Sequence, residues 1–160
     1  MQRYLLELVV VGVIAGGSLA SVADASFSGN VCGLLTAKQV ASAKVTPAKC
    51  TTEPTVRQSG GIDYHGYWGT GPIAASSLLF QVNTGTATYL QLAKRVVGDI
   101  PGAKKVSGIG SVAYIGSSVN GTTTVQFVVG NYICTMYFNK VKSLKSAAVI
   151  ALAKVVAGEL

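Results

Sequence analysis

Three apolar segments near the C-terminus, separated by short turn sequences, restrict the fold of this chain more than any other feature. They cover residues 112–119, 122–129 and 132–138, with Asn120-Gly121 and Gly130-Asn131 between them. Both dipeptides favour two-residue hairpin loops, because their residues tolerate a positive φ. We therefore predict three consecutive antiparallel strands.

The predicted two-residue loops also determine which residues face each other. Phe127 is expected opposite Cys134 in the second hairpin and opposite Tyr114 in the first. Alternation along the strands then predicts an apolar core face, which consists of Val112, Tyr114, Val125, Phe127, Val129, Tyr132, Cys134, Met136 and Phe138. The outward face is expected to be mostly polar, with Ile115, Val119, Val128 and Ile133 mixed in.

Helices are expected on both sides of this region. Apolar spacing and flanking Pro or Gly residues predict helices over about 36–46, 86–97 and 146–158, and Thr36 is a candidate cap for the first. Two further strands are predicted at 62–68 and 78–82. The elements together predict an α+β fold, in which an antiparallel sheet carries the helices on one face.

Two parts of the chain resemble each other. The segment 87–98 recurs in 147–158, with Ala, Leu, Lys, Val and Gly at matching positions. This similarity suggests two strand–strand–helix repeats. The alternative is that two helices rich in Ala and Val converged on packing against a sheet. Residues 51–61 are polar and rich in turn formers, so a loop is expected there.

The first 25 residues have the pattern of a secretory signal peptide. A positive start at Arg3 precedes a largely apolar run, and Ala23-Asp24-Ala25 forms an A-x-A cleavage signature. We therefore expect an exported protein, secreted or associated with the cell envelope, with one domain over 26–160. The alternative is an uncleaved anchor, for which the apolar run is short, because a spanning helix needs about 20 apolar residues.

The charge balance is basic, with 13 Lys and Arg residues against 6 Asp and Glu residues and a net charge of +7. Such an excess favours anionic partners, or simply keeps the surface solvated. Lys94, Arg95, Lys104 and Lys105 are candidate ligand-binding residues on a basic side. Export makes nucleic acid an improbable partner, so a cell-envelope polymer, a lipid headgroup or an envelope protein is expected instead.

The segment 63–69 contains a second group of candidate ligand-binding residues. On a strand, His65 and Tyr67 share one face, while Tyr64 and Trp68 share the other. The functional interpretation is an aromatic platform for a sugar ring or a lipid headgroup. The alternative places Tyr64 and Trp68 in the core and His65 at a solvated strand edge.

Little in the sequence supports catalysis. His65 is the only histidine, and the few acidic residues are scattered, so an Asp63–His65 pair is the only general-base candidate. No C-x-x-C pair or phosphate-binding loop occurs in the chain. We therefore expect a protein that is not an enzyme and has no metal and no cofactor.

The three cysteines are Cys32, Cys50 and Cys134, and export makes one disulfide plausible. A bond between Cys32 and Cys50 would close a loop around the first helix. The alternative bond joins Cys134 to one of the other two. If Cys134 stays free, it is expected to act as a small apolar residue of the core.

Two short motifs resemble those of a known family. Cys32-Gly33-Leu34-Leu35-Thr36, and later the segment 108–114 (Gly-Ile-Gly-Ser-Val-Ala-Tyr), are similar to motifs of small exported or lipidated domains of unknown function that are common in actinobacteria. Ser111 stands where the family usually has Asp, and no lipidation signal precedes Cys32. The resemblance implies an envelope-associated, non-catalytic domain with a disulfide between Cys32 and Cys50.

The resulting hypothesis is a secreted, non-catalytic domain that binds an anionic or amphipathic ligand of the cell envelope. The alternative is a structural protein that associates with itself or with a membrane partner through its sheet. The outward β-branched residues Ile115, Val119, Val128 and Ile133 would suit that alternative, because exposed strands of this kind favour pairing.

Overall fold

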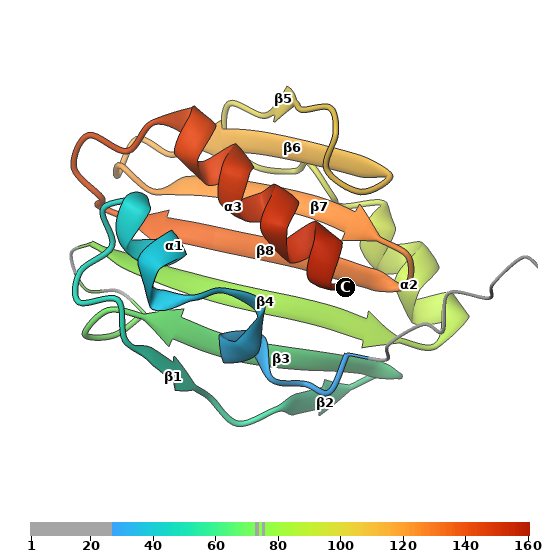
Figure 1. The fold of residues 1–160 in the computed structure, drawn as a ribbon. Helices are drawn as coiled ribbons and strands as arrows, with labels where there is room; N and C mark the ends of the chain where they lie inside the picture. The colour runs from blue at the N-terminus through green and yellow to red at the C-terminus, as the bar shows by residue number, and fades with distance from the viewer. Residues whose placement is uncertain (1–26, 73, 75) are drawn as a thin grey trace, which may run out of the picture.

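The computed structural model describes residues 27–160 except 73 and 75, so the predicted signal peptide, residues 1–25, lies outside the described residues. The described part contains an eight-stranded antiparallel sheet and confirms the α+β class (Figure 1). The strand order is β1-β3-β4-β8-β7-β6-β5, and β2 also pairs with β3. Among the described helices, none has the length and apolar character needed to cross a membrane.

The elements in chain order are the 3-10 helix η1 (Val31–Leu34), α1 (Ala37–Ser42), β1 (Cys50–Thr52), β2 (Val56–Gln58), β3 (Gly61–Trp68), β4 (Ser77–Gly85), α2 (Ala87–Lys94), β5 (Lys104–Lys105), β6 (Val112–Ser117), β7 (Thr123–Val129), β8 (Tyr132–Asn139) and α3 (Ser146–Glu159).

The β7–β8 hairpin has the predicted register. Val129 lies opposite Tyr132, and Phe127 lies opposite Cys134, as a two-residue Gly130-Asn131 loop requires. Phe127 and Cys134 are fully buried on the core face. Burial raises the pKa of the Cys134 thiol, which is free and acts as an apolar core residue.

The predicted register of the β6–β7 hairpin is wrong by one residue. Val112 lies opposite Val128, and Tyr114 lies opposite Gln126 rather than Phe127. The connection is a five-residue loop, 118–122, closed by a hydrogen bond from the Ser118 N–H to the Thr122 carbonyl (2.9 Å). Because side chains alternate with a period of two, this shift moves Val112 and Tyr114 from the core face to the outer face. Ala113 takes their place in the core.

Helices η1, α1 and α3 cover the core face of the sheet, in front of it in Figure 1. The buried residues of α3 are Val149, Leu152, Ala153 and Val156, which follow helical spacing. Thr36 caps α1 in a capping box, in which its Oγ1 accepts from the Gln39 N–H (3.3 Å) and its N–H donates to Gln39 Oε1 (2.7 Å).

Helix α2 lies on the other face of the sheet, which we call the outer face, so the helices do not all share one face as expected. Figure 1 shows α2 behind the right-hand end of the sheet. Its Leu90 packs against Val128 and Ile133, whose chain neighbours Phe127 and Cys134 belong to the main core. The strands are therefore apolar on both faces at this end, and the helix covers the second apolar surface.

The strand–strand–helix order occurs twice, as β3-β4-α2 and β7-β8-α3. Strands β4 and β8 are antiparallel neighbours, so an axis perpendicular to the sheet would relate the two hairpins. Such an axis keeps both helices on the same face, whereas α2 and α3 lie on opposite faces. The matching residues also differ in burial, since Leu92 and Val96 are exposed whereas Leu152 and Val156 are buried, so the two helices do not pack as equivalent repeats.

Residues 51–61, expected to be a loop, contain most of two short strands. Strands β1 and β2 pair in succession with β3; β1 ends before the break around Pro54, and β2 begins after it. A disulfide joins Cys50 at the start of β1 to Cys32 in η1. The bond confirms one of the two predicted pairings and attaches the N-terminal segment to the edge of the sheet.

We expect the Cys32→Ala/Cys50→Ala variant to have a free energy of unfolding lower by about 3 kcal/mol, because the loop around α1 becomes free in the unfolded chain. Urea unfolding at neutral pH measures the difference. Wild-type protein unfolded with a reductant present should match the variant. Equal stability of oxidised wild type and variant would contradict the prediction.

Candidate binding site on the outer face of the sheet

The outer face carries two adjacent rows of side chains across its central strands. His65, Gln81, Thr135 and Gln126 are successive partners on β3, β4, β8 and β7, and we call them the polar row. Tyr67, Leu79 and Tyr137 are successive partners on β3, β4 and β8, and we call them the aromatic row. Helix α2 has only eight residues and covers one end of this face, beside the polar row.

A groove with a volume of about 230 Å³ lies between α2 and the outer face. Its walls differ in chemistry. The apolar side is formed by Ala93, Val96, Val97 and Ile133. The polar side is formed by Gln81, Asn83, Tyr89, Gln126, Thr135 and Tyr137. All six polar side chains are amides or hydroxyls, so no charged side chain is among the described residues that line this groove.

The N-terminal end of α2 is held by a cap and by a buried carboxylate. Thr86 Oγ1 accepts from the Tyr89 N–H (3.3 Å), and the Tyr89 hydroxyl donates to Asp63 Oδ1 (3.3 Å). The Asn83 amide also donates to Asp63 Oδ1. The Tyr89 ring lies over Gly61, where an added Cβ would stand 2.3 Å from ring atoms, so this position needs glycine.

The C-terminal end of α2 is held by Gly98, which ends the turn after the helix with a φ of 95°. Its N–H donates to Gln126 Oε1 (2.9 Å). Its Cα lies against the Tyr114 ring, where an added Cβ would be 2.8 Å from a ring atom. Both ends of α2 therefore contact the outer face directly, and the groove between them has a defined shape.

Several polar groups near the groove can form further hydrogen bonds. Among the described residues, the side chains of Gln81, Thr135 and Tyr137 have no hydrogen-bond partner. A tyrosine hydroxyl, with its usual pKa of about 10, is protonated and able to donate near neutral pH, and burial raises the pKa of Tyr137 further. His65 Nε2, at the end of the polar row, is buried without a partner among the described residues.

The aromatic cluster predicted around residue 65 is divided between the two faces. Trp68 is 1% exposed and packs beside Phe80 in the core, so it offers no surface to a ligand. Tyr64 is half-buried on the same side, edge-on to the Phe27 ring. His65 and Tyr67 are half-buried on the outer face. Neither of these two side chains lines the groove, but both belong to rows that border it, and Asp63 contacts the groove residues Asn83 and Tyr89.

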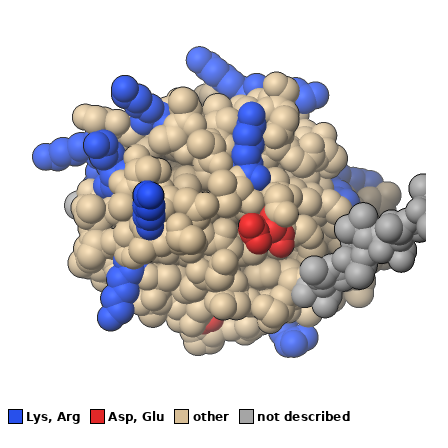
Figure 2. All heavy atoms as spheres, in the orientation of Figure 1, with Lys and Arg blue, Asp and Glu red and all other residues tan. Residues whose placement is uncertain are grey.

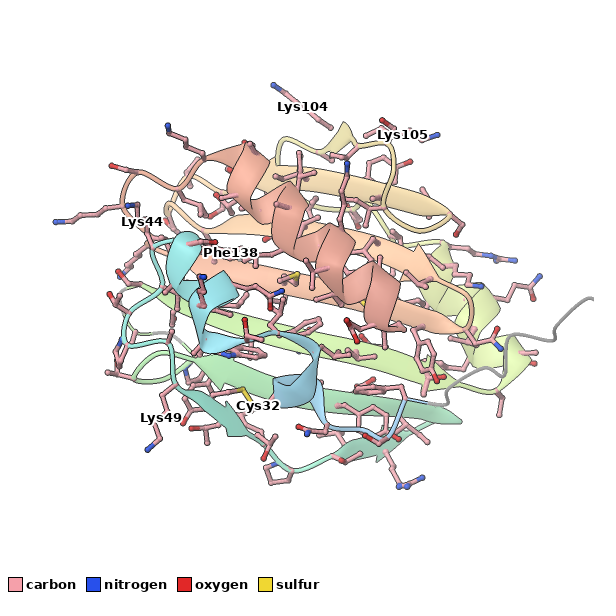
Figure 3. The ribbon with its side chains drawn as sticks, viewed as in Figure 1. Cys32, Lys44, Lys49, Lys104, Lys105 and Phe138 are labelled. Carbon is pink, nitrogen blue, oxygen red and sulfur yellow. A yellow bond between two sulfur atoms is a disulfide. The ribbon has the colours of Figure 1, made fainter. Side chains whose placement is uncertain are left out.

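The predicted basic residues are also dispersed. Lys94 and Arg95 are exposed at the end of α2, where Lys94 Nζ donates to the Gly130 carbonyl (3.3 Å). Lys104 and Lys105 lie on the edge strand β5, and Figure 3 shows their side chains leaving it in different directions. Figure 2 shows Lys and Arg side chains projecting singly around the helix-covered face rather than gathering in one patch.

The arrangement suits binding by hydrogen bonds and surface contact. The Asp63 carboxylate, the acidic member of the predicted Asp63–His65 pair, accepts hydrogen bonds from the Asn83 amide and the Tyr89 hydroxyl. No group of three or more His, Cys, Asp and Glu side chains suited to a metal ion occurs in the described part of the chain. The chemistry on offer at the groove is therefore that of neutral donors and acceptors beside an apolar wall.

The groove residues Gln81, Asn83, Gln126, Thr135 and Tyr137 were not predicted as a site. The alternation of Gln81 and Asn83 with buried Phe80 and Val82 marks one polar strand face in the sequence. Which strands lie beside it, and which helix covers it, are not visible in that pattern.

Comparison with known proteins identifies no relative: no family model, no curated protein and no solved structure matches the chain. The resemblance to the actinobacterial exported domains therefore stays a prediction.

We expect the stability of the wild type to fall at high pH more steeply than that of Tyr89→Phe. Burial, with the Asp63 charge as a second cause, raises the pKa of Tyr89 above its usual value of about 10. Because the fold favours the neutral form of Tyr89, this residue contributes to the free energy of unfolding. The contribution is complete below pH about 10 and is lost as the pH rises through the folded-state pKa. Urea unfolding at pH about 8 and about 11 measures both slopes. Equal slopes would show that Tyr89 ionises as freely in the fold as in the unfolded chain.

Proposed function

We propose that this protein is an exported, non-catalytic binding domain that holds an amphipathic ligand of the cell envelope in the groove beside α2. The observation that carries the proposal is the asymmetry of the groove. Val96 and Val97 offer an apolar wall, and Gln81, Gln126 and Thr135 offer hydrogen bonds from the other side. A ligand with one apolar and one polar side would satisfy both.

The size of the groove supports a polymer or another extended ligand. Pockets that enclose whole small molecules have volumes of about 300–1,000 Å³. The groove has about 230 Å³ and is bordered by the half-buried aromatic row of Tyr67, Leu79 and Tyr137. It is therefore suited to hold part of a larger ligand that continues across the sheet.

Export is supported by three observations of different kinds. The Cys32–Cys50 disulfide is typical of oxidising compartments. The N-terminal sequence has a signal-peptide pattern with a cleavage signature that ends at Ala25. The family resemblance of the motifs at Cys32 and at 108–114 also implies an envelope protein.

The net charge of +7 has a supporting role in this proposal. On the face shown in Figure 2 the lysines do not form a single patch, and they attract the protein to an anionic envelope without defining one site. That attraction is screened by salt. The contacts in the groove are uncharged and depend on salt far less.

Self-association through the sheet, the alternative function, has less structural support. Val119 is fully exposed but lies in the loop between β6 and β7, Val128 and Ile133 are 2% and 5% exposed beneath α2, and Ile115 is half-buried on the core face. One edge strand, β5, consists of Lys104 and Lys105, and the other edge is interrupted at Pro54. Short, charged or Pro-broken edges disfavour pairing between sheets.

We expect Val96→Glu to reduce retention on isolated cell envelopes of the source organism about tenfold, because a charge would replace part of the apolar wall. Leu92→Glu is the matched control. Leu92 is 57% exposed and Val96 is 58% exposed, but only Val96 lines the groove. Both variants carry the same added charge, so equal retention of the two would refute the groove as the binding site.

We also expect the protein from its native host to begin at Ser26, because Ala23-Asp24-Ala25 is the predicted cleavage signature. Mass spectrometry of the N-terminal peptide from the medium and envelope fractions checks this. Recovery of peptides from residues 1–25 in the envelope form would favour the uncleaved anchor.

A further inference from the structure

The polar side of the groove has a consistent chemical character. Its six side chains are amides and hydroxyls from three neighbouring strands and from α2. From this we infer that the ligand is a neutral glycan, an uncharged chain of sugar units from an envelope polysaccharide. The inference rests on the proposed function, because it names the ligand class of the same groove.

The two rows of the outer face match the two aspects of a sugar ring. A pyranose has an apolar face of C–H groups and a rim of hydroxyls. Tyr67, Leu79 and Tyr137 form a surface on which the C–H face can lie. The polar row lies directly alongside, since its residues are two positions away on the same strands.

The unused hydrogen-bonding groups are of the kind that hydroxyls require. A sugar hydroxyl both donates and accepts, and an amide side chain offers a donor and an acceptor together. Gln81 and Thr135 have no partner among the described residues. Gln126 uses its oxygen to accept from Gly98, which leaves its NH₂ group to donate to a ligand. The hydroxyl of Tyr137, the member of the aromatic row that lines the groove, completes the set.

The spacing of these groups favours an extended chain that runs across the strands. Neighbouring strands are about 4.8 Å apart, so the polar row offers a hydrogen-bonding side chain at about that interval. The interval is close to the length of one sugar unit in an extended glycan. The groove includes residues of β4, β8 and β7, so it is continuous across three strands.

Other envelope ligands fit the same groove less well. A phosphate or carboxylate would lose water without gaining a cation, because no Lys or Arg is among the described residues that line the groove. An acyl chain would cover Gln81 and Thr135 and leave their polar groups unpaired. A neutral polyhydroxylated ligand satisfies the polar side without either cost.

The test is a competition experiment with defined fractions of the source envelope. Envelope polysaccharide is partly hydrolysed and separated by anion exchange into neutral and charged oligosaccharides, and vesicles are made from the envelope lipids. Each fraction is added to the processed protein, residues 26–160, while it is bound to intact envelopes. We expect the neutral oligosaccharides to release the protein and to bind with similar affinity at about 0.1 M and about 1 M salt, where screening lengths differ about threefold.

Two glutamines provide matched variants. Gln81→Met removes the hydrogen-bonding amide from the groove, and Gln91→Met makes the same change on an exposed position of α2. We expect Gln81→Met to weaken binding of the neutral oligosaccharides about tenfold, since a ligand hydroxyl is left without its partner, and Gln91→Met to leave it unchanged. Circular dichroism and thermal unfolding establish whether both variants are folded. If Gln81→Met does not fold, Tyr137→Phe replaces it as the groove variant.

The outcomes separate this inference from the proposed function. Release by charged oligosaccharides or lipid vesicles alone would overturn the glycan inference, and so would equal binding by Gln81→Met and Gln91→Met. If Val96→Glu still lowers envelope retention in those cases, the groove remains the binding site for another ligand. If Val96→Glu behaves like Leu92→Glu, the groove itself is refuted.

Discussion

The pairing of β4 with β8 is the interaction on which the rest of the structure depends. It joins the β3–β4 hairpin to the β7–β8 hairpin across a long stretch of chain and makes one continuous sheet. Its register places Phe80 beside Met136 on the core face and Gln81 beside Thr135 on the outer face. A shift by one residue would exchange these faces, so the buried core stabilises the register that also forms the floor of the groove.

The second constraint is that the central strands are apolar on both faces at one end. Phe127 and Cys134 belong to the main core beneath α3, while Val128 and Ile133 point the other way and need a cover of their own. Helix α2 supplies that cover but is only eight residues long. The rest of the outer face stays open, and the groove forms where the helix ends and the polar row begins. The candidate site is thus a consequence of incomplete coverage.

Local features were predictable where local forces decide them. The Gly130-Asn131 turn gave the correct β7–β8 register, Thr36 caps α1, and α3 follows the spacing of its apolar residues. The predicted β6–β7 register was wrong because Asn120-Gly121 favours a two-residue turn. Tertiary packing instead selects a five-residue loop, which places Val112 on the outer face, against α2. Of the candidate site, His65 and Tyr67 were predicted, while the groove residues were not, because neutral Gln and Thr have no distinctive motif.

The sequence by itself determined the α+β class, most strand and helix positions and the basic charge, and it left the disulfide pairing open between Cys32–Cys50 and a bond to Cys134. These properties depend on alternation, helical spacing, turn residues and composition, which are all local or additive. Only the tertiary structure decided that α2 lies on the outer face, that Trp68 is buried, and that Gln81, Thr135 and Gln126 stand in one row. The physical reason is that these relations need non-local strand pairing, and the best burial of the whole chain selects that pairing.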